Sequence, residues 1–377
     1  MKVLIFGMDG YIGYPLYLKL LENHTVLGVD NLIRRERVRN TGGCSVTPIP
    51  MPRKRFADDL CFGDATNYHT VSEVIKGFKP DVIVHLAHQP SAPYSMKSPK
   101  TASETFDNNL TTTCNILWAM RKHAKEAHLI TIGTLGEYAD WIYNGITIPE
   151  SDVITVLTHK QRPWRIPAPR EGSSLYHLSK TAMSTMIRYA CRIWGLKATD
   201  IMQGIVYGVS IDNTPEEDRL TRFDVDATWG TIINRFTAMS IIQHPLTVYG
   251  EGGQTRGIIS IKDSVNAIKT LIENPPEEPQ YRVVNQFHEV YTIKQIAHMV
   301  AEVAEKVLGH SITIRHVQNP RKELERHVYQ PEAKLLKQLG VKPLTTVREE
   351  VERTIQILTN YKQRIPVDKL MPDVRWC

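Results

Sequence analysis

The chain has 377 residues, 42% of them hydrophobic and 23% charged, so it can bury a large core and is not a disordered polymer. Its net charge of +6 permits an anionic partner, but the basic residues form no long run with interleaved aromatics. This argues against nucleic acid and favours a small phosphorylated substrate. Five widely spaced cysteines without a CxxC pair argue against a disulfide framework and against a metal site.

The N-terminus leads directly into a strand pattern and lacks the basic and apolar regions of a signal peptide. No apolar run is long enough to span a bilayer. We therefore expect a cytoplasmic protein that has no membrane partner, with a cleaved targeting segment as the open alternative.

Residues 2–6 form a short apolar run that is typical of a buried parallel strand. Gly7, Gly10 and Gly13 follow at a spacing of three, and the leucines after them indicate a helix. A glycine turn between a strand and a helix lets the backbone and the helix N-terminus approach a pyrophosphate. The pattern predicts a dinucleotide site.

The second apolar run, residues 25–29, ends at Asp30. An acid at this position is expected to bind the adenosine ribose hydroxyls and to favour NAD over NADP. Arg34, Arg35 and Arg37 follow closely. Because a cation there could accept a ribose phosphate, NADP stays an open alternative.

Further apolar runs alternate with helical patterns up to about residue 208, which predicts an α/β fold with a doubly wound parallel sheet of the Rossmann type. We expect residues 1–208 and about 240–275 to form this domain. The remaining residues, about 209–239 and 276–377, are expected to form a smaller mixed α/β lobe that binds the substrate.

Tyr176 and Lys180 are four residues apart, so they lie on one face of a predicted helix. An ammonium group beside a phenol lowers the pKa of the phenol and makes it a usable base. The pair alone is also compatible with a half-solvated helix face. Thr134, which follows a buried strand pattern, is expected to hold the substrate oxygen.

Residues 139–172 interrupt the alternation, and we expect this long segment to cover the substrate. Further along, Arg256 follows several glycines and offers a planar fork suited to phosphate, with an exposed arginine on a hairpin as the structural alternative. Arg321 is expected on a loop with a similar role.

These motifs, in this order, resemble the extended short-chain dehydrogenase/reductase superfamily and its nucleotide-sugar branch. Within it, the chain is similar to the UDP-sulfoquinovose synthase family. The segments that carry this resemblance are 29–35, 89–96, 133–138, 176–180, 203–209, 244–257 and 371–376.

The resemblance implies that NAD oxidises carbon 4 of UDP-glucose, water is eliminated across carbons 5 and 6, sulfite adds at carbon 6, and hydride returns. It assigns catalysis to Thr134, Tyr176 and Lys180, with His177 as the candidate for proton transfer at carbon 5 or 6. The expected substrate-binding residues are Thr134, Gln203, Thr231, Arg235, Tyr249, Gln254, Arg256 and Arg321.

The expected cofactor residues lie in the glycine turn, at the ends of strands and on the helix with the Tyr-Lys pair. They are Gly7, Gly10, Tyr11, Ile12, Gly13, Asp30, Asn31, Arg34, Arg35, Asp64, Ala65, Leu86, Ala87, His88, Asn109, Tyr176, Lys180, Gln203 and Val206. Asp64 could bind the adenine amino group or only cap the following helix.

Two departures from related families bear on the activity. Leu135 and Gly136 stand where the 4,6-dehydratases have Asp and Glu, and Pro90 stands where synthases have Arg. The first departure removes the usual acid and base of a dehydratase, and the second requires another cation to hold sulfite. A 4-epimerase or 4,6-dehydratase stays the alternative enzyme, and a non-catalytic nucleotide-sensing or RNA-binding protein is a further one. A homodimer or higher homo-oligomer is expected by analogy.

Overall fold

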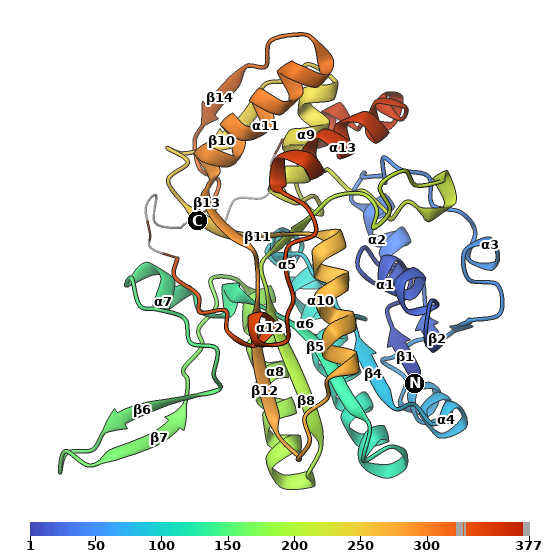
Figure 1. The fold of residues 1–377 in the computed structure, drawn as a ribbon, viewed down its shortest axis with the longest axis vertical. Helices are drawn as coiled ribbons and strands as arrows, with labels where there is room; N and C mark the ends of the chain where they lie inside the picture. Colours follow the sequence, from blue (N-terminus) through green and yellow to red (C-terminus); the bar gives the residue numbers. More distant parts are fainter. Residues whose placement is uncertain (322–326, 328, 372–377) are drawn as a thin grey trace.

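The computed structural model describes residues 1–321, 327 and 329–371. Most of the segment at 371–376 that carries part of the family resemblance lies outside the described residues. The chain forms a large sheet flanked by helices, with a second lobe packed at one end of it (Figure 1). The two terminal parts of the chain lie in different regions: β1 is in the large sheet and α13 (Val347–Thr359) is in the lobe.

The large sheet has seven strands in the order β12-β8-β5-β4-β1-β2-β3, and all of its neighbouring pairs are parallel. The predicted doubly wound sheet is therefore confirmed. The strands are β1 (Lys2–Phe6), β2 (Thr25–Asp30), β3 (Leu60–Phe62), β4 (Val82–His85), β5 (His128–Thr134), β8 (Lys197–Gln203) and β12 (Tyr281–Gln286).

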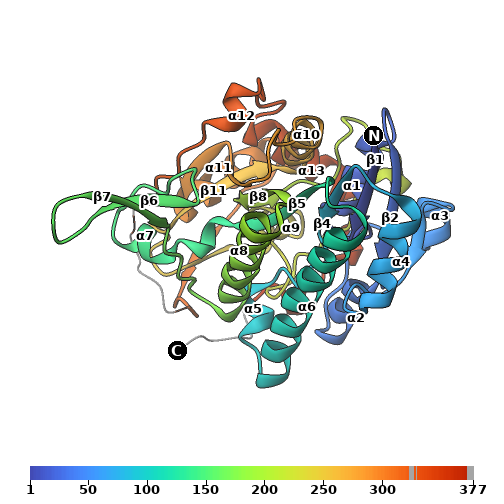
Figure 2. The same ribbon diagram turned by 90° about the horizontal axis from the view of Figure 1, so that it is seen from below.

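Helices cover both faces of this sheet, as parallel sheets require (Figure 2). The buried residues of α4 (Tyr68–Phe78), α6 (Pro99–His123) and α8 (Leu175–Trp194) share one apolar cluster with the sheet. Those of α1 (Gly13–Leu20) and α10 (Ile261–Glu273) share another.

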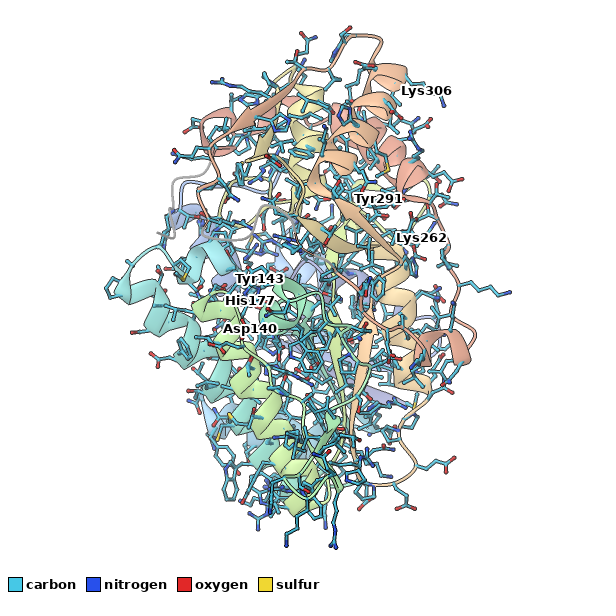
Figure 3. The ribbon with its side chains drawn as sticks, turned by 90° about the vertical axis from the view of Figure 1, so that its left-hand side faces the viewer. Asp140, Tyr143, His177, Lys262, Tyr291 and Lys306 are labelled. Atoms are coloured by element: carbon cyan, nitrogen blue, oxygen red, sulfur yellow. The ribbon has the colours of Figure 1, made fainter. Side chains whose placement is uncertain are left out.

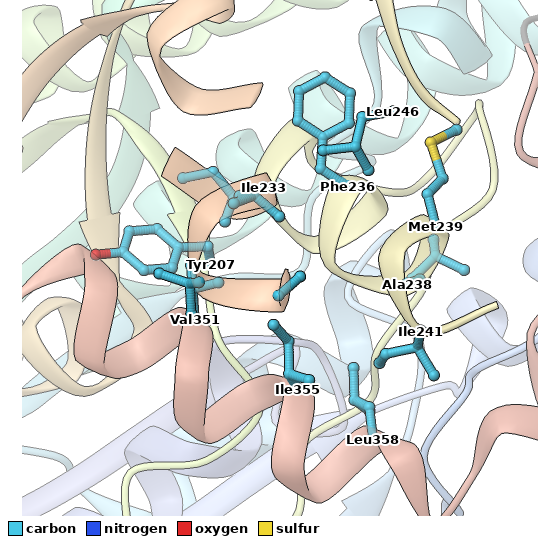
Figure 4. Packing of buried hydrophobic residues seen from close by; sticks show 14 of the residues in the cluster. Tyr207, Ile233, Phe236, Ala238, Met239, Ile241, Leu246, Val351, Ile355 and Leu358 are labelled. Atoms are coloured by element: carbon cyan, nitrogen blue, oxygen red, sulfur yellow. The ribbon is translucent and has the colours of Figure 1, made fainter. Parts of the chain in front are cut away.

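The lobe is built on a third cluster, to which α9 (Ile232–Ile241), α11 (Ile293–Leu308) and α13 contribute most (Figure 4). A two-stranded parallel sheet, β10 (Leu246–Tyr249) with β14 (Ile314–Val317), packs beside them. A three-stranded sheet of β9 (Ile205–Tyr207), β11 (Thr255–Ser260) and β13 (Glu289–Thr292) lies where the lobe joins the Rossmann domain.

Strand pairing departs from the expected division of the chain in two places. The segment 276–377 was assigned to the lobe, but β12 pairs along its whole length with β8, because its buried Val283 and Val284 complete the sheet core. Conversely, β10 belongs to the lobe through β14, although 240–275 was assigned to the Rossmann domain. The hairpin alternative for 246–257 is wrong as well, since β10 and β11 lie in different sheets.

The segment 139–172 contains α7 (Ala139–Tyr143) and a hairpin of β6 (Val153–Leu157) and β7 (Pro163–Pro167). The hairpin projects away from the body, and Trp164 is 66% exposed (Figures 1 and 2). Smaller elements complete the described chain: α2 (Ile33–Asn40), α3 (Pro52–Phe56), α5 (Ala92–Ser95), α12 (Leu335–Gln338) and the 3-10 turns η1 (Leu135–Glu137), η2 (Glu217–Arg219), η3 (Lys362–Arg364) and η4 (Val367–Lys369).

Helix α13 offers a test of the lobe core. Ile355 is fully buried against this core, whereas the next residue, Gln356, is exposed. We expect Ile355→Ala to lower the free energy of unfolding by about 2–5 kcal/mol, because it leaves a cavity as well as losing apolar contact. Gln356→Ala, the control on the same helix, is expected to change it by less than about 0.5 kcal/mol in urea unfolding. Equal effects of the two substitutions would contradict this packing.

Candidate functional site

A cavity of about 350 Å³ lies at the carboxyl ends of the central strands. Its lining includes Gly7 after β1, Asp30 at the end of β2, Leu86 after β4, Thr134 at the end of β5 and Gln203 at the end of β8. This is where open α/β sheets bind their ligands.

The glycine turn has the geometry that a dinucleotide needs. Gly7 adopts a φ of +87°, and a Cβ on Gly13 would lie 2.3 Å from the Gly7 carbonyl oxygen. Side chains at these positions would force the turn apart. The tight turn leads directly into α1, so its backbone and the start of that helix face the cavity, and the residues present fit a pyrophosphate.

The Asp30 carboxylate is fixed at the wall of the cavity. One of its oxygens accepts a hydrogen bond from the backbone N–H of Asp9 at 2.9 Å, and the other accepts one from Leu32 at 2.7 Å. Burial and the nearby Asp9 carboxylate raise the pKa of Asp30 to about 6. An acid held in this way can bind ribose hydroxyls and would repel a ribose phosphate.

Two of the three arginines that left NADP open are already paired with carboxylates; the third, Arg37, lines the cavity and lies 3.4 Å from the side-chain oxygen of Asn108. Arg35 makes a bidentate pair with Asp9, with both distances 2.7 Å, and does not line the cavity. Arg34 lines the cavity but pairs with Asp224 at 2.8 Å and stacks on Trp229, with its guanidinium carbon 3.8 Å from the ring centre. These carboxylate partners favour a ribose without a phosphate.

Most of the expected cofactor residues line this cavity. They are Gly7, Gly10, Tyr11, Ile12, Gly13, Asp30, Asn31, Arg34, Asp64, Ala65, Leu86, Ala87, His88, Tyr176, Lys180, Gln203 and Val206. Asn109 does not: its buried amide bonds Gln89 and Ser179, while its neighbour Asn108 reaches the lining. Asp64 does not cap α4, because Asn67 does so.

Helix α8 places the Tyr-Lys pair. The Ser174 side chain caps its N-terminus by accepting from the His177 N–H, and Gly195 ends it in the left-handed conformation. Lys180 is only 2% exposed, and its ammonium donates to the Ile132 carbonyl and to His88 Nδ1, both at 2.7 Å. Burial lowers the pKa of Lys180 to about 7.

The relation between the two side chains differs from the sequence expectation. The Lys180 Nζ atom lies 5.8 Å from the centre of the Tyr176 ring and is hydrogen-bonded elsewhere. Burial, and then the Glu137 carboxylate, raise the pKa of the Tyr176 phenol above its ordinary value. The geometry therefore does not show the expected lowering of this pKa, because the ammonium is turned toward the end of β4.

Thr134 is held by its own turn. Its hydroxyl oxygen accepts from the Gly136 N–H at 3.1 Å, and its backbone N–H donates to Glu137 at 3.1 Å. Glu137 is fully buried and also accepts from Ser184 on α8 and from Arg170, at 3.2 and 3.3 Å. Burial raises the pKa of Glu137 to about 7. The sequence analysis did not single out this acid.

A second cavity of about 230 Å³ adjoins the first and shares Thr134, Gln203 and Arg321 with it. His177 and Tyr143 both line it, and they lie near each other in Figure 3. Only α7 of the long segment contributes to it, whereas no residue of the β6–β7 hairpin lines either cavity. The expectation that the whole segment covers the substrate is thus wrong for the hairpin.

The His177 side chain packs closely between two glycines, Gly136 and Gly172. A Cβ on Gly136 would lie 2.3 Å from His177 Nε2, and a Cβ on Gly172 would lie 2.2 Å from His177 Cβ. The Nδ1 atom is within hydrogen-bonding distance of the Ser174 hydroxyl at 3.0 Å. Burial, with Arg321 and Arg256 nearby, lowers the pKa of His177 to about 3, so its imidazole is neutral and able to accept a proton.

Five of the eight expected substrate residues line one or both cavities. Thr134, Gln203, Thr231 and Arg321 line the first cavity, and Thr134, Gln203, Arg256 and Arg321 line the second. The other three lie outside both linings: the Arg235 guanidinium is 5.2 Å from the centre of the Tyr249 ring, and Gln254 is buried.

Several lining residues were not foreseen, among them Asp224, Thr228, Trp229 and Asn234. They come from the irregular segment after β9 and from α9. No periodicity or motif marks that segment, so sequence gave no signal for them. Within the described residues there is no helix able to cross a membrane and no cluster of His, Cys, Asp and Glu suited to a metal.

Comparison with known structures supports the fold. UDP-glucose 4-epimerase of Thermus thermophilus, solved in complex with NAD, superimposes with a TM-score of 0.67 at 21% identity, covering 95% of this chain and 99% of that one. At this identity the likeness concerns the fold only.

Sequence comparison reaches further. Residues 3–285 match the NAD dependent epimerase/dehydratase family. The UDP-sulfoquinovose synthase of Sulfolobus acidocaldarius is 39% identical over 388 aligned residues, covering 100% of this chain and 98% of the relative. The chloroplastic UDP-sulfoquinovose synthase of Spinacia oleracea is also 39% identical, covering 100% of this chain and 79% of the relative. The chain therefore belongs to the NAD dependent epimerase/dehydratase family and, within it, to the UDP-sulfoquinovose synthases.

Proposed function

We propose that this protein makes UDP-sulfoquinovose from UDP-glucose and sulfite, with NAD as its cofactor. The observation that carries the proposal is the 39% identity to two UDP-sulfoquinovose synthases, each aligned over all of this chain. When bound, NAD accepts hydride from carbon 4 of the sugar and later returns it. The net reaction joins UDP-glucose and sulfite and releases water, with no net oxidation.

In this proposal, the first cavity holds NAD and the sugar lies where the two cavities meet, at Thr134. Tyr176 in its ionised form takes the proton of the carbon-4 hydroxyl, while Thr134 holds that oxygen. The positive charges of Lys180 and of bound NAD would favour this ionised form. The ketone acidifies the carbon-5 proton, and loss of the carbon-6 hydroxyl as water then gives an enone to which sulfite adds. Lys180 holds the nicotinamide ribose.

His177 is the proposed base at carbon 5 or carbon 6. It lines the second cavity, and its Nε2 fills the space that any side chain at position 136 would need. The dehydratases place Glu there, so in this chain the imidazole takes the position of that acid. The alternative activity of a 4,6-dehydratase is correspondingly less supported.

Arg256 and Arg321 are the proposed partners of the UDP diphosphate, because both line the second cavity. Their charges contribute to the low pKa of His177. A bound diphosphate would neutralise them, and the pKa of His177 would then rise toward its ordinary value. Substrate binding would thus make His177 a stronger base.

The proposal also includes a cytoplasmic location and a homodimer or larger homo-oligomer. An interface on α6 and α8 is supported by the exposed large side chains of Trp118, Tyr189 and Ile193, which are 47%, 49% and 54% exposed. Such side chains on neighbouring helices are common in interfaces.

The activity is tested with purified protein, NAD and UDP-glucose, with and without sulfite, by mass spectrometry of the nucleotide sugars. We expect a sulfonated product only with sulfite, and at least a roughly 100-fold loss of rate in Tyr176→Phe, because the proton acceptor is removed. Tyr68→Phe, at an exposed tyrosine of α4, is the control. UDP-galactose or a dehydrated ketosugar formed regardless of sulfite would instead establish the epimerase or dehydratase reading.

The role of His177 is tested by deuterium incorporation in D₂O without sulfite. The wild-type protein is expected to exchange the carbon-5 proton while the ketone exists, so the recovered UDP-glucose gains one mass unit. We expect His177→Ala to slow this exchange by roughly 100-fold and to retain oxidation at carbon 4, which is followed as transient NADH. His159→Ala, at an exposed histidine of the hairpin segment, is the control. Unchanged exchange in His177→Ala would assign the base elsewhere.

The diphosphate role is tested by Arg256→Met. Loss of one charge-assisted contact is expected to raise the KM for UDP-glucose by roughly 10- to 100-fold, with a smaller effect on kcat. Arg315→Met, which removes an exposed arginine of β14, is expected to leave KM unchanged. A KM in Arg256→Met equal to that of the wild type would refute this contact.

A further inference from the structure

The buried ammonium of Lys180 has an unusual partner. One of its hydrogen bonds goes to a backbone carbonyl, that of Ile132 on β5. The other goes to a side chain, the imidazole of His88, at 2.7 Å. His88 follows the end of β4 and lines the cofactor cavity.

The chemistry of the two groups fixes the state of His88. A lysine ammonium has donors only, so His88 Nδ1 must accept and the proton of the imidazole sits on Nε2. Burial, together with His85 and Lys180, lowers the pKa of His88 well below its ordinary value, so the ring is neutral. His88 is therefore an acceptor for Lys180 throughout the working pH range.

The imidazole has little freedom to move. Its ring centre is 4.0 Å from that of His85, which is fully buried and lies near the Thr113 hydroxyl at 3.2 Å. The backbone N–H of His88 donates to the Leu86 carbonyl at 2.7 Å. The acceptor thus projects from the rigid end of a central strand.

The other ionisable groups around Lys180 come from four elements. Glu137 in η1 and Asp200 on β8 act on it as negative charges, and both favour the ammonium form. His85 and His88 at the end of β4 are neutral, and Tyr176 lies on α8 itself, one turn away. Among the side chains of the described residues, only that of His88 is hydrogen-bonded to the ammonium.

We propose that His88 is the positioning residue for Lys180: its Nδ1 accepts from the ammonium, keeps it charged in its buried site and aims it along the cofactor cavity. This role rests on the proposed function, because Lys180 matters through its contact with the nicotinamide ribose and its charge near Tyr176. His88 itself does not touch the reacting atoms in this role.

The test compares three substitutions of His88 in the full-length protein. In His88→Asn the amide oxygen can take the place of Nδ1 as acceptor, in His88→Gln the oxygen lies one bond further out, and His88→Leu has no acceptor. The readouts are the dissociation constant of NAD and kcat, each measured from pH 5.5 to pH 9. His69→Leu, which changes an exposed histidine of α4, is the control and should match the wild type.

Loss of the acceptor removes a hydrogen bond to a charged group, which we expect to lower the pKa of Lys180 by about one unit. In His88→Leu, the affinity for NAD and kcat should therefore begin to fall at a lower pH than in the wild type. At pH 8 each should be roughly tenfold below the wild-type value. His88→Asn should stay within about twofold of the wild-type profile, with His88→Gln between the two.

A pH profile of NAD binding in His88→Leu that matches the wild type would overturn the proposal. Equal losses of NAD affinity and kcat in His88→Asn and His88→Gln would overturn it as well. If His88→Leu fails to fold, the comparison of His88→Asn with His88→Gln still tests the proposal, because both side chains are polar and differ in the position of the acceptor oxygen. The dissociation constant of NAD can be measured without turnover. If the wild-type protein makes no sulfonated product, the proposed function is contradicted, but the effect of His88 on NAD binding can still be measured.

Discussion

The carboxylate of Glu137 is the interaction that the rest of the site depends on. It is fully buried, and it receives the backbone N–H of Thr134, the hydroxyl of Ser184 and the guanidinium of Arg170. Three separate segments, the end of β5, helix α8 and the end of the long insert, thus meet at one group. Removing one partner of a buried charge typically costs about 3–5 kcal/mol, so these segments are strongly held in one arrangement.

These contacts fix which face of α8 is turned toward the buried polar cluster. Tyr176, Lys180 and Ser184 recur at intervals of four, so they share one face of the helix. The same Ser184 hydroxyl is shared with Asp200 on β8, whose oxygen lies 2.5 Å away, and Tyr281 on β12 donates to that oxygen at 2.5 Å. Gly133 is required beside this cluster, since a Cβ there would lie 2.7 Å from Asp200 and 3.0 Å from Glu137. The helix that carries the phenol and the ammonium is therefore fixed by polar contacts at its buried centre.

Sequence reasoning succeeded where a local pattern carries the physics. The glycine turn and the acid at the end of β2 predict positions in a parallel sheet, and this sheet is confirmed. The Tyr-Lys spacing predicts one face of a helix, and both residues lie on α8. It failed where distant segments meet. The pairing of β12 with β8, the partners of Arg34 and Arg35, and the turn of Lys180 toward His88 all depend on tertiary contacts that no short pattern encodes.

The insert shows the same division between what is fixed and what is free. Its two ends are joined by the bridge between Tyr138 and Glu171 and by the Trp141 indole, which donates to the Pro169 carbonyl at 2.8 Å. These contacts fix the distance between the two ends of the insert, so that distance does not depend on the length of the hairpin. The entropic cost of closing the loop also rises only slowly as residues are added. Evolution can lengthen, shorten or recompose the β6–β7 arm while the chemistry beneath it keeps its geometry, which makes this arm the part of the enzyme best suited to diverge between lineages.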